Sequence, residues 1–250
     1  MRGMLLAIET SQRNSSVAVG TLSLEAQLGD FLSESIDTSD RQKEDILPAI
    51  ERLCARAQVT REHIGALALN AGPGGFSGLR IAHAAAQVIG EAWSIPIVQI
   101  SAAVVAREAA VVSELIVPEQ SVWVALASKS DGCWMAKVLN SRDGNDVPQQ
   151  MGVRDLNDWP LQTGDALITD EHLPERWRAK ALECGNSIIA LQPTAQAVWR
   201  VACRLLSRGH HVSPEHILPV YPREAEAVRL WRERHGTNLT DRTDGTASCF

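Results

Sequence analysis

The stretch Asn70-Ala71-Gly72-Pro73-Gly74-Gly75-Phe76-Ser77-Gly78-Leu79-Arg80 decides the fold of this chain. The short apolar run 64–69 before it predicts a buried strand, and the alanine-rich run up to Trp93 after it predicts a helix. A glycine loop therefore opens a helix directly after a strand. Such a loop either holds an anion on the first free N–H groups of the helix, or it is a tight turn that packs the helix on the sheet.

The loop differs from the common phosphate-binding motifs. No Gly-Lys-Ser/Thr follows at the spacing of a P-loop, and the glycines do not read Gly-x-Gly-x-x-Gly. Ser77 could cap the helix or donate its hydroxyl to a bound group. The candidate anion-binding residues of this loop are Gly72, Gly74, Gly75 and Ser77.

Composition and charge exclude several classes of protein. The chain has 250 residues and a net charge of −6, which argues against a free-standing surface for nucleic acid. Five scattered cysteines without a Cys-x-x-Cys pair argue against a disulfide framework or a zinc site and favour a reducing compartment. The apolar run Met4 to Ile8 is too short for a signal peptide core or a membrane span. We therefore expect a cytoplasmic protein without membrane contact.

The N-terminal segment predicts a β-hairpin. Residues 4–9 form an apolar run that ends in polar turn residues, and residues 16–20 alternate small and apolar side chains. Glu9, Thr10 and Ser11 lie at the end of the first strand and are the second part of the candidate anion site. The alternative for these three residues is a strand that ends in a solvated turn.

Two helices of the first half carry broad apolar surfaces. In the segment 42–57 the apolar residues recur at spacings of three and four, which predicts one buried face. In the segment 76–93 the polar residues Arg80, His83, Gln87 and Glu91 form one narrow stripe, so this helix must be covered on two sides. One cover is the sheet, and the other is a neighbouring helix or a second protein chain.

The second half repeats the style of the first. Residues 121–127 and 133–139 predict strands joined by a hairpin turn at Asp131-Gly132. Further strands are expected at 165–169 and 187–191, with helices at 175–182 and 194–207, whereas 140–161 is polar and reads as irregular. The recurring order of strands and helices indicates that the two halves of the chain are organised in a similar way.

Two motifs resemble those of a known family. Gly72 to Arg80 is similar to the Gly-Pro-Gly-Ser-Phe-Thr-Gly-Leu-Arg signature of the TsaB (YeaZ) family, and Pro219 to Arg223 is similar to its closing Pro-x-Tyr-Leu-Arg, with Pro222 as a departure. The resemblance covers roughly residues 4–231. It implies an α/β fold of the actin-like ATPase (ASKHA, ribonuclease H-like) type with two similar subdomains. These would be 1–112 and 113–235, the last segment of the second packing back on the first, followed by a disordered tail at 236–250.

The resemblance also implies a function. TsaB proteins are inactive relatives of TsaD, and this one would be a non-catalytic scaffold in the synthesis of N6-threonylcarbamoyladenosine in tRNA. It would bind and stabilise TsaD for the transfer of threonylcarbamoyl from its adenylate to the adenosine beside the anticodon. The helices 42–57 and 76–93 would form the interface with TsaD or with a second copy of the chain, and the interface residues expected are Ile46, Ile50, Leu53, Leu79, Arg80, His83, Ala86, Gln87 and Gly90. A TsaE-like ATPase would be a further partner, and tRNA would be met only through the complex.

Departures from the family pattern bear on chemistry. Glu9 stands where the family has aspartate, and Ala127-Ser128-Lys129 replaces an Asp-Ala-Arg at the cleft. The segment 101–107 lacks the His-x-x-x-His pair with which TsaD holds a metal. We therefore expect no catalytic residue, no metal site and no required cofactor, with ATP or ADP and magnesium at a subunit junction left open. The alternatives are a stand-alone small-molecule kinase or ATPase of the same superfamily, or a metalloprotease, for which the zinc motif is missing.

Overall fold

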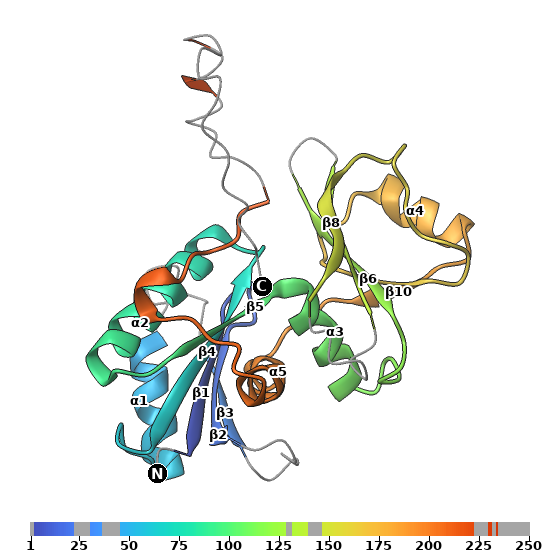
Figure 1. Cartoon of the computed structure of the whole chain (residues 1–250). Helices are drawn as coiled ribbons and strands as arrows, with labels where there is room; N and C mark the ends of the chain where they lie inside the picture. Colours follow the sequence, from blue (N-terminus) through green and yellow to red (C-terminus); the bar gives the residue numbers. More distant parts are fainter. Residues whose placement is uncertain are drawn as a thin grey trace.

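The structure is a computed structural model with two sheets and five main helices among the residues it describes (Figure 1). These residues are 3–22, 31–36, 46–128, 132–139, 147–222, 230, 231 and 234. The elements are β1 (Met4–Glu9), β2 (Ser16–Thr21), β3 (Phe31–Ser35), α1 (Ile46–Ala57), β4 (Ile64–Gly72), α2 (Phe76–Trp93), β5 (Ile97–Ser101), α3 (Ala102–Val112), β6 (Val122–Ala127), β7 (Cys133–Val138), β8 (Gln149–Arg154), β9 (Ala166–Thr169), α4 (Glu175–Glu183), β10 (Ser187–Ala190), α5 (Ala195–Ser207) and the short 3-10 helix η2 (Pro214–His216).

Both sheets have five strands in the same order. The first runs β3-β2-β1-β4-β5, and the second, read from its other edge, runs β8-β7-β6-β9-β10. In each sheet, the first three strands in sequence order form an antiparallel meander. The fourth strand pairs in parallel with the first, and the fifth pairs in parallel with the fourth. The second half of the chain therefore repeats the topology of the first, as the repeated strand and helix pattern predicts.

Side-chain alternation on the central strand of the first sheet builds two cores. Leu6 and Ile8 of β1 face α1 and α2, whereas Leu5 and Ala7 face α3 and α5 on the other side. This is the pattern of a strand buried on both faces. The first sheet thus lies between two helical layers.

The second sheet is covered in the same way. Val122, Val124 and Leu126 of β6 belong to the core that contains α3 and α5, whereas Trp123 and Ala125 face α4. The layers from one side of the molecule to the other are α1 and α2, the first sheet, α3 and α5, the second sheet, and α4 (Figure 1). The inner pair, α3 and α5, shares one continuous core with both sheets.

The helix α5 is anchored on the sheet of the first half although it ends the second. It contacts β1, β2, β4 and β5. Thr194 caps its N-terminus by accepting a hydrogen bond from Ala197 N at 3.2 Å, and Ala195 N–H donates to Ser16 Oγ of β2 at 3.0 Å. The two halves of the chain are therefore interlocked in space.

A segment beyond α5 runs back along the edge of the first sheet. Ile97 of β5 and Val212 exchange both backbone hydrogen bonds, at 2.9 and 2.8 Å. Further on, the Gln99 side chain donates to the Leu218 carbonyl at 2.8 Å, and Val220 N–H donates to Ala71 O at 2.7 Å. The outer side of β5 is thus lined by residues 212–220.

Several sequence-based predictions need correction. The segment 140–161 was predicted to be irregular, but it contains β8, whose residues are mostly exposed because it is an edge strand with an interrupted apolar pattern. The third strand of the first sheet, β3, extends from Phe31 to Ser35, and residues 23–30 before it lie outside the described residues. Residues 42–45 of the predicted first helix, the turn residue Asp131, most of 223–235 and the tail 236–250 lie outside the described residues.

The leucines of α1 give a direct test of this packing. Leu53 is fully buried in the core between α1 and the first sheet, whereas Leu47 on the same helix is 55% exposed. We expect Leu53→Ala to lower the free energy of unfolding by about 2–5 kcal/mol because it leaves a cavity. We expect Leu47→Ala to change it by about 0.5 kcal/mol or less. Denaturant unfolding of both variants measures the difference, and equal losses would contradict the orientation of α1.

Candidate functional site

The turn between β1 and β2 lies directly against the start of α2. Gly75 N–H donates to Ser11 O at 2.8 Å, and Thr10 Oγ1 donates to Gly78 O at 2.9 Å. The glycine loop and the predicted second half of the site, 75–78 and 10–11, are therefore brought together, as the anion-site hypothesis requires. The two segments are in direct backbone contact with each other.

Glycine is needed here because two backbones touch. A β-carbon on Gly74 would lie 2.5 Å from Ser11 O, and one on Gly78 would lie 2.2 Å from Thr10 O. Neither distance is tolerable for a side chain. Of the two readings of the loop, this geometry favours the tight turn that packs α2 against the sheet.

Of the two roles considered for Ser77, capping of the helix is not seen. The N-cap of α2 is Gly75, and no side chain caps this end of the helix. Ser77 is exposed, as are Gly74 and Gly75, whereas Gly72 is buried and holds a left-handed φ of 101°. In the glycine loop, Gly74, Gly75 and Ser77 are therefore accessible to solvent, whereas the turn at Gly72 is buried.

Glu9 is turned into the protein. Its Oε1 accepts from Ser11 N at 2.7 Å, and its Oε2 accepts from Asn70 Nδ2 at 2.7 Å. Asn70 Nδ2 also lies 3.0 Å from Ser11 Oγ, and Asn70 Oδ1 accepts from Gly72 N at 2.8 Å. Burial raises the pKa of the Glu9 carboxyl, against the opposing effect of the hydrogen bonds from Ser11 and Asn70.

This arrangement does not fit a magnesium-bound phosphate, the ligand that the actin-like ATPase fold implies. Both Glu9 oxygens are bound to protein donors, and the residue is 0% exposed. The carbonyls of Thr10 and Ser11, which repel an anion, face the loop where a phosphate would need N–H donors. The extra methylene of glutamate lets the carboxylate reach Asn70 and the Ser11 amide rather than the opening.

The edge of the second sheet carries an acidic residue that the sequence analysis missed. Asp170 follows β9 and accepts hydrogen bonds from Ala127 N at 3.2 Å and His172 N at 3.0 Å. Burial is the main cause of its raised pKa. A sequence signal for Asp170 was available, because an aspartate directly after a buried strand is a common site residue. Since β9 pairs with β6, Asp170 lies next to Ala127, which stands where the family has an aspartate.

Three further predicted interface residues lie on the polar stripe of α2. Arg80 is exposed and its guanidinium lies 3.9 Å from the ring centroid of Phe76, which in turn contacts Tyr221 with centroids 5.3 Å apart. Gln87 is half-buried and donates to Glu91 Oε1 at 3.1 Å. His83 is buried, so of these three only Arg80 and Gln87 are accessible.

His83 is a structural residue of the core. Its Nδ1 lies 2.7 Å from Leu79 O, and its Nε2 lies 3.1 Å from Gln99 Nε2. The carbonyl can only accept and the amide nitrogen only donates, which selects the neutral tautomer with the proton on Nδ1. Burial lowers the pKa of His83 and favours the same uncharged form.

The other residues expected at the interface point into the core of this structure. Ile46, Ile50 and Leu53 of α1 and Ala86 of α2 pack on the first sheet. Leu79 is 0% exposed, and a β-carbon on Gly90 would meet Pro214 at 2.7 Å. The apolar faces read from the sequence are the faces that hold the helices on the sheet.

The accessible apolar surface lies on the opposite side of α2. Ile81 is 40% and Val88 is 64% exposed, and Ala84 between them is exposed as well. Their spacing of three and four places them on one face of the helix. We call Ile81, Ala84 and Val88 the outer stripe of α2. Helix α1, which contacts α2, adds Leu47 at 55% exposure.

Neither a metal cluster nor a membrane helix is found in the described part of the chain. Within those ranges no three histidine, cysteine, aspartate or glutamate side chains are grouped so that they could hold a metal ion. None of the helices described is long and apolar enough to span a bilayer.

Comparison with known proteins agrees with the topology. Residues 36–125 match the family described as TsaD: tRNA N6-adenosine threonylcarbamoyltransferase. A crystal structure of an uncharacterized protein with similarity to peptidase YeaZ, from Pseudomonas aeruginosa, matches with a TM-score of 0.71 and 22% identity, over 88% of this chain and 100% of that one. YeaZ from Pseudomonas aeruginosa matches with a TM-score of 0.67 and 23% identity, over 88% of this chain and 99% of the other.

The chain has the fold of YeaZ. The predicted α/β fold with two similar subdomains is thus confirmed, and the comparisons support the predicted resemblance to TsaB (YeaZ). The TsaD match runs from the end of β3 into β6, so it contains α1, α2 and the glycine loop. A comparison with curated protein sequences gives no significant match.

The backbone contact at the glycine loop can be tested by a pair of glycine substitutions. Gly78→Ala places a methyl group against Thr10 O, so we expect it to lower the free energy of unfolding by about 2–4 kcal/mol. Gly75→Ala is the control, because its β-carbon would lie 3.6 Å from Ser11 O, at ordinary contact distance. We expect it to cost about 1 kcal/mol or less. Thermal or denaturant unfolding gives both values, and a Gly78→Ala variant as stable as Gly75→Ala would contradict the contact.

Proposed function

We propose that this chain is a non-catalytic scaffold in the synthesis of N6-threonylcarbamoyladenosine in tRNA, and that it binds a TsaD-type protein through α2 and α1. The outer stripe of α2 is the observation that carries the proposal. Ile81, Ala84 and Val88 expose apolar surface on one helix face, and this helix lies inside the region that matches the TsaD family. Apolar side chains exposed together on one face of a helix suit a protein–protein interface.

The small residues of α2 favour a helical partner. Ala84 is exposed and Ala85 is half-buried beside it, so a second helix can approach the α2 backbone closely between Ile81 and Val88. Leu47 of α1 would extend the apolar contact to the neighbouring helix. A second copy of this chain is the competing occupant of the same surface.

The candidate site argues for a scaffold rather than for a small-molecule kinase or ATPase. Glu9 is fully buried and hydrogen-bonded within the chain, and Ala127 has no functional group at the equivalent strand end of the second sheet. Any ATP or ADP with magnesium would therefore be held by the partner or at the junction with it. With a net charge of −6, the chain would meet tRNA only as part of the complex, and the TsaE-like ATPase would likewise join there.

The interface is tested by substitution of the outer stripe. We expect Val88→Arg and Ala84→Arg to keep the fold, because both residues are exposed, and to weaken binding of the TsaD-type protein of the same organism by more than about 100-fold. Size-exclusion co-elution and calorimetry measure the binding. Analytical ultracentrifugation of the chain alone shows whether a second copy uses the same surface.

Two control variants separate binding from folding. Leu182→Arg changes a leucine of α4 that is 61% exposed but lies in the other subdomain, and it should bind the partner as the unchanged chain does. Ala86→Arg places an unpaired charge in the core and should prevent folding. The proposal is wrong if folded Val88→Arg and Ala84→Arg bind with undiminished affinity, or if the unchanged chain forms no complex at tens of micromolar.

A further inference from the structure

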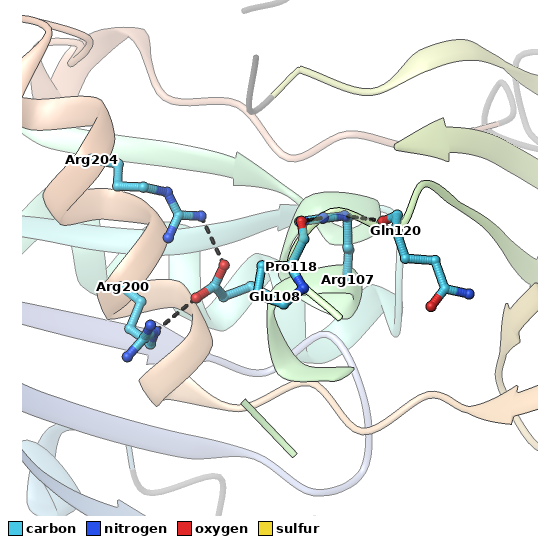
Figure 2. Close-up of polar contacts among 6 residues, drawn as sticks. All are labelled: Arg107, Glu108, Pro118, Gln120, Arg200 and Arg204. Atoms are coloured by element: carbon cyan, nitrogen blue, oxygen red, sulfur yellow. Dashed lines mark hydrogen bonds and ion pairs between the residues drawn. The ribbon is translucent and has the colours of Figure 1, made fainter. Parts of the chain in front are cut away.

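Two arginines of α5 bind one buried carboxylate of α3 (Figure 2). Arg200 Nε donates to Glu108 Oε1 at 2.7 Å, and Arg204 Nη2 donates to Glu108 Oε2 at 2.8 Å. The Glu108 side chain is only 4% exposed, and the two arginines lie one helical turn apart. Both oxygens of the carboxylate therefore form charge-assisted hydrogen bonds to the same helix.

The charge of Glu108 is maintained by its partners. Burial alone would raise the pKa of the Glu108 carboxyl, but the nearby Arg204 and Arg200 guanidinium groups outweigh this effect and hold the pKa below its ordinary value. The cluster is thus ionised at neutral pH. Loss of one partner would leave an uncompensated charge in a core region, which is more costly than the loss of an exposed ion pair.

Arg107, the residue before Glu108, connects α3 to the segment that leads into the second sheet. Arg107 Nε donates to Gln120 O at 3.1 Å, and the same guanidinium donates to Pro118 O (Figure 2). Gln120 lies two residues before β6. Two consecutive residues of α3 therefore bind the connection to the second sheet on one side and α5 on the other.

The position of the cluster gives it a role between the subdomains. Helix α3 follows the first sheet in sequence and contacts both sheets, whereas α5 follows the second sheet and lies on the first. A change in the angle between the sheets that carries α3 with the second sheet would move α3 along α5, by the kind of sliding between packed helices that accompanies domain closure. Such a movement separates Glu108 from Arg200 and Arg204.

We propose that Glu108, Arg200 and Arg204 form a lock between α3 and α5 that holds the two subdomains in a single relative orientation. The chain then behaves as one rigid body, in contrast to enzymes that close two lobes over a substrate. The inference goes beyond the proposed function and does not depend on which partner binds the outer stripe. Its experiment uses the chain alone, so its failure would leave the partner-binding proposal untouched.

A second cluster in the same chain provides a matched control. Arg52 Nε donates to Glu34 Oε1 at 2.7 Å, and Arg56 Nη1 donates to Glu34 Oε2 at 3.0 Å. Here too, one carboxylate is bound by two arginines one turn apart. This cluster joins α1 to β3 within the first subdomain, and its arginine side chains are more than half exposed. Its loss should not affect the angle between the subdomains.

The test measures the distance between the subdomains. Spin labels are attached at Glu51→Cys in α1 and Leu182→Cys in α4, two exposed positions, in the full chain with Cys54, Cys184 and Cys249 changed to serine. Pulsed electron resonance then gives the distribution of distances. We expect a single narrow distribution for the labelled chain, a broadened or split one after Glu108→Gln, and an unchanged one after Glu34→Gln.

The outcomes separate a lock from a merely stabilising contact. If Glu108→Gln lowers the melting temperature but keeps the narrow distribution, the cluster only stabilises the fold and the proposal is wrong. A broad distribution in the labelled chain before any charge is removed would overturn it as well. Should Glu108→Gln fail to fold, Arg204→Lys takes its place, because it keeps the charge but loses the planar fork, and the same broadening is required of it.

Discussion

The burial of β1 on both faces is the constraint on which the rest of the structure depends. Its residues alternate between the core under α1 and α2 and the core around α3 and α5. A strand of this kind cannot form the outside of a two-layer protein, so helices must cover both sides of its sheet. The strand β6 has the same position in the second sheet, so this sheet also needs helices on both faces. The helices α3 and α5 cover one face of each sheet. The interlocked arrangement of the two halves follows from this shared layer.

The same constraint shapes the candidate site at the end of β1. The end of β1 leads into the turn that touches the start of α2, and the contact is made by carbonyls of Thr10 and Ser11 against glycine. Glu9 then satisfies the Ser11 amide and the Asn70 side chain rather than a ligand. The residues of the candidate site have become part of the packing between strand, turn and helix. What remains accessible nearby is the outer surface of α2.

Much of the fold could be predicted because its signals are local. The glycine loop, the apolar strand before it and the alanine-rich helix after it place β4 and α2, and the bounds of α2 agree with the prediction.

The orientation of the helices could not be predicted in the same way. In α2, alanine occurs on the buried side at Ala82 and Ala86 and on the exposed side at Ala84, so side-chain type does not identify the face. The pairing of Glu108 with Arg200 and Arg204 joins residues more than 90 positions apart, and only the packing of α3 on α5 reveals it. Likewise β8 lacked a signal because an edge strand exposed on most of its residues needs little apolar alternation.

The lining of β5 by residues 212–220 has a consequence for assembly. An uncovered edge strand presents free main-chain groups, which invite strand addition from another chain. Here Val212 uses the main-chain groups of Ile97, and the closing segment continues alongside through Gln99 to Ala71. The outward main-chain groups of Ile97 are therefore not available to a strand from another protein. At this point of the edge, a partner has to recognise side chains rather than free main-chain groups.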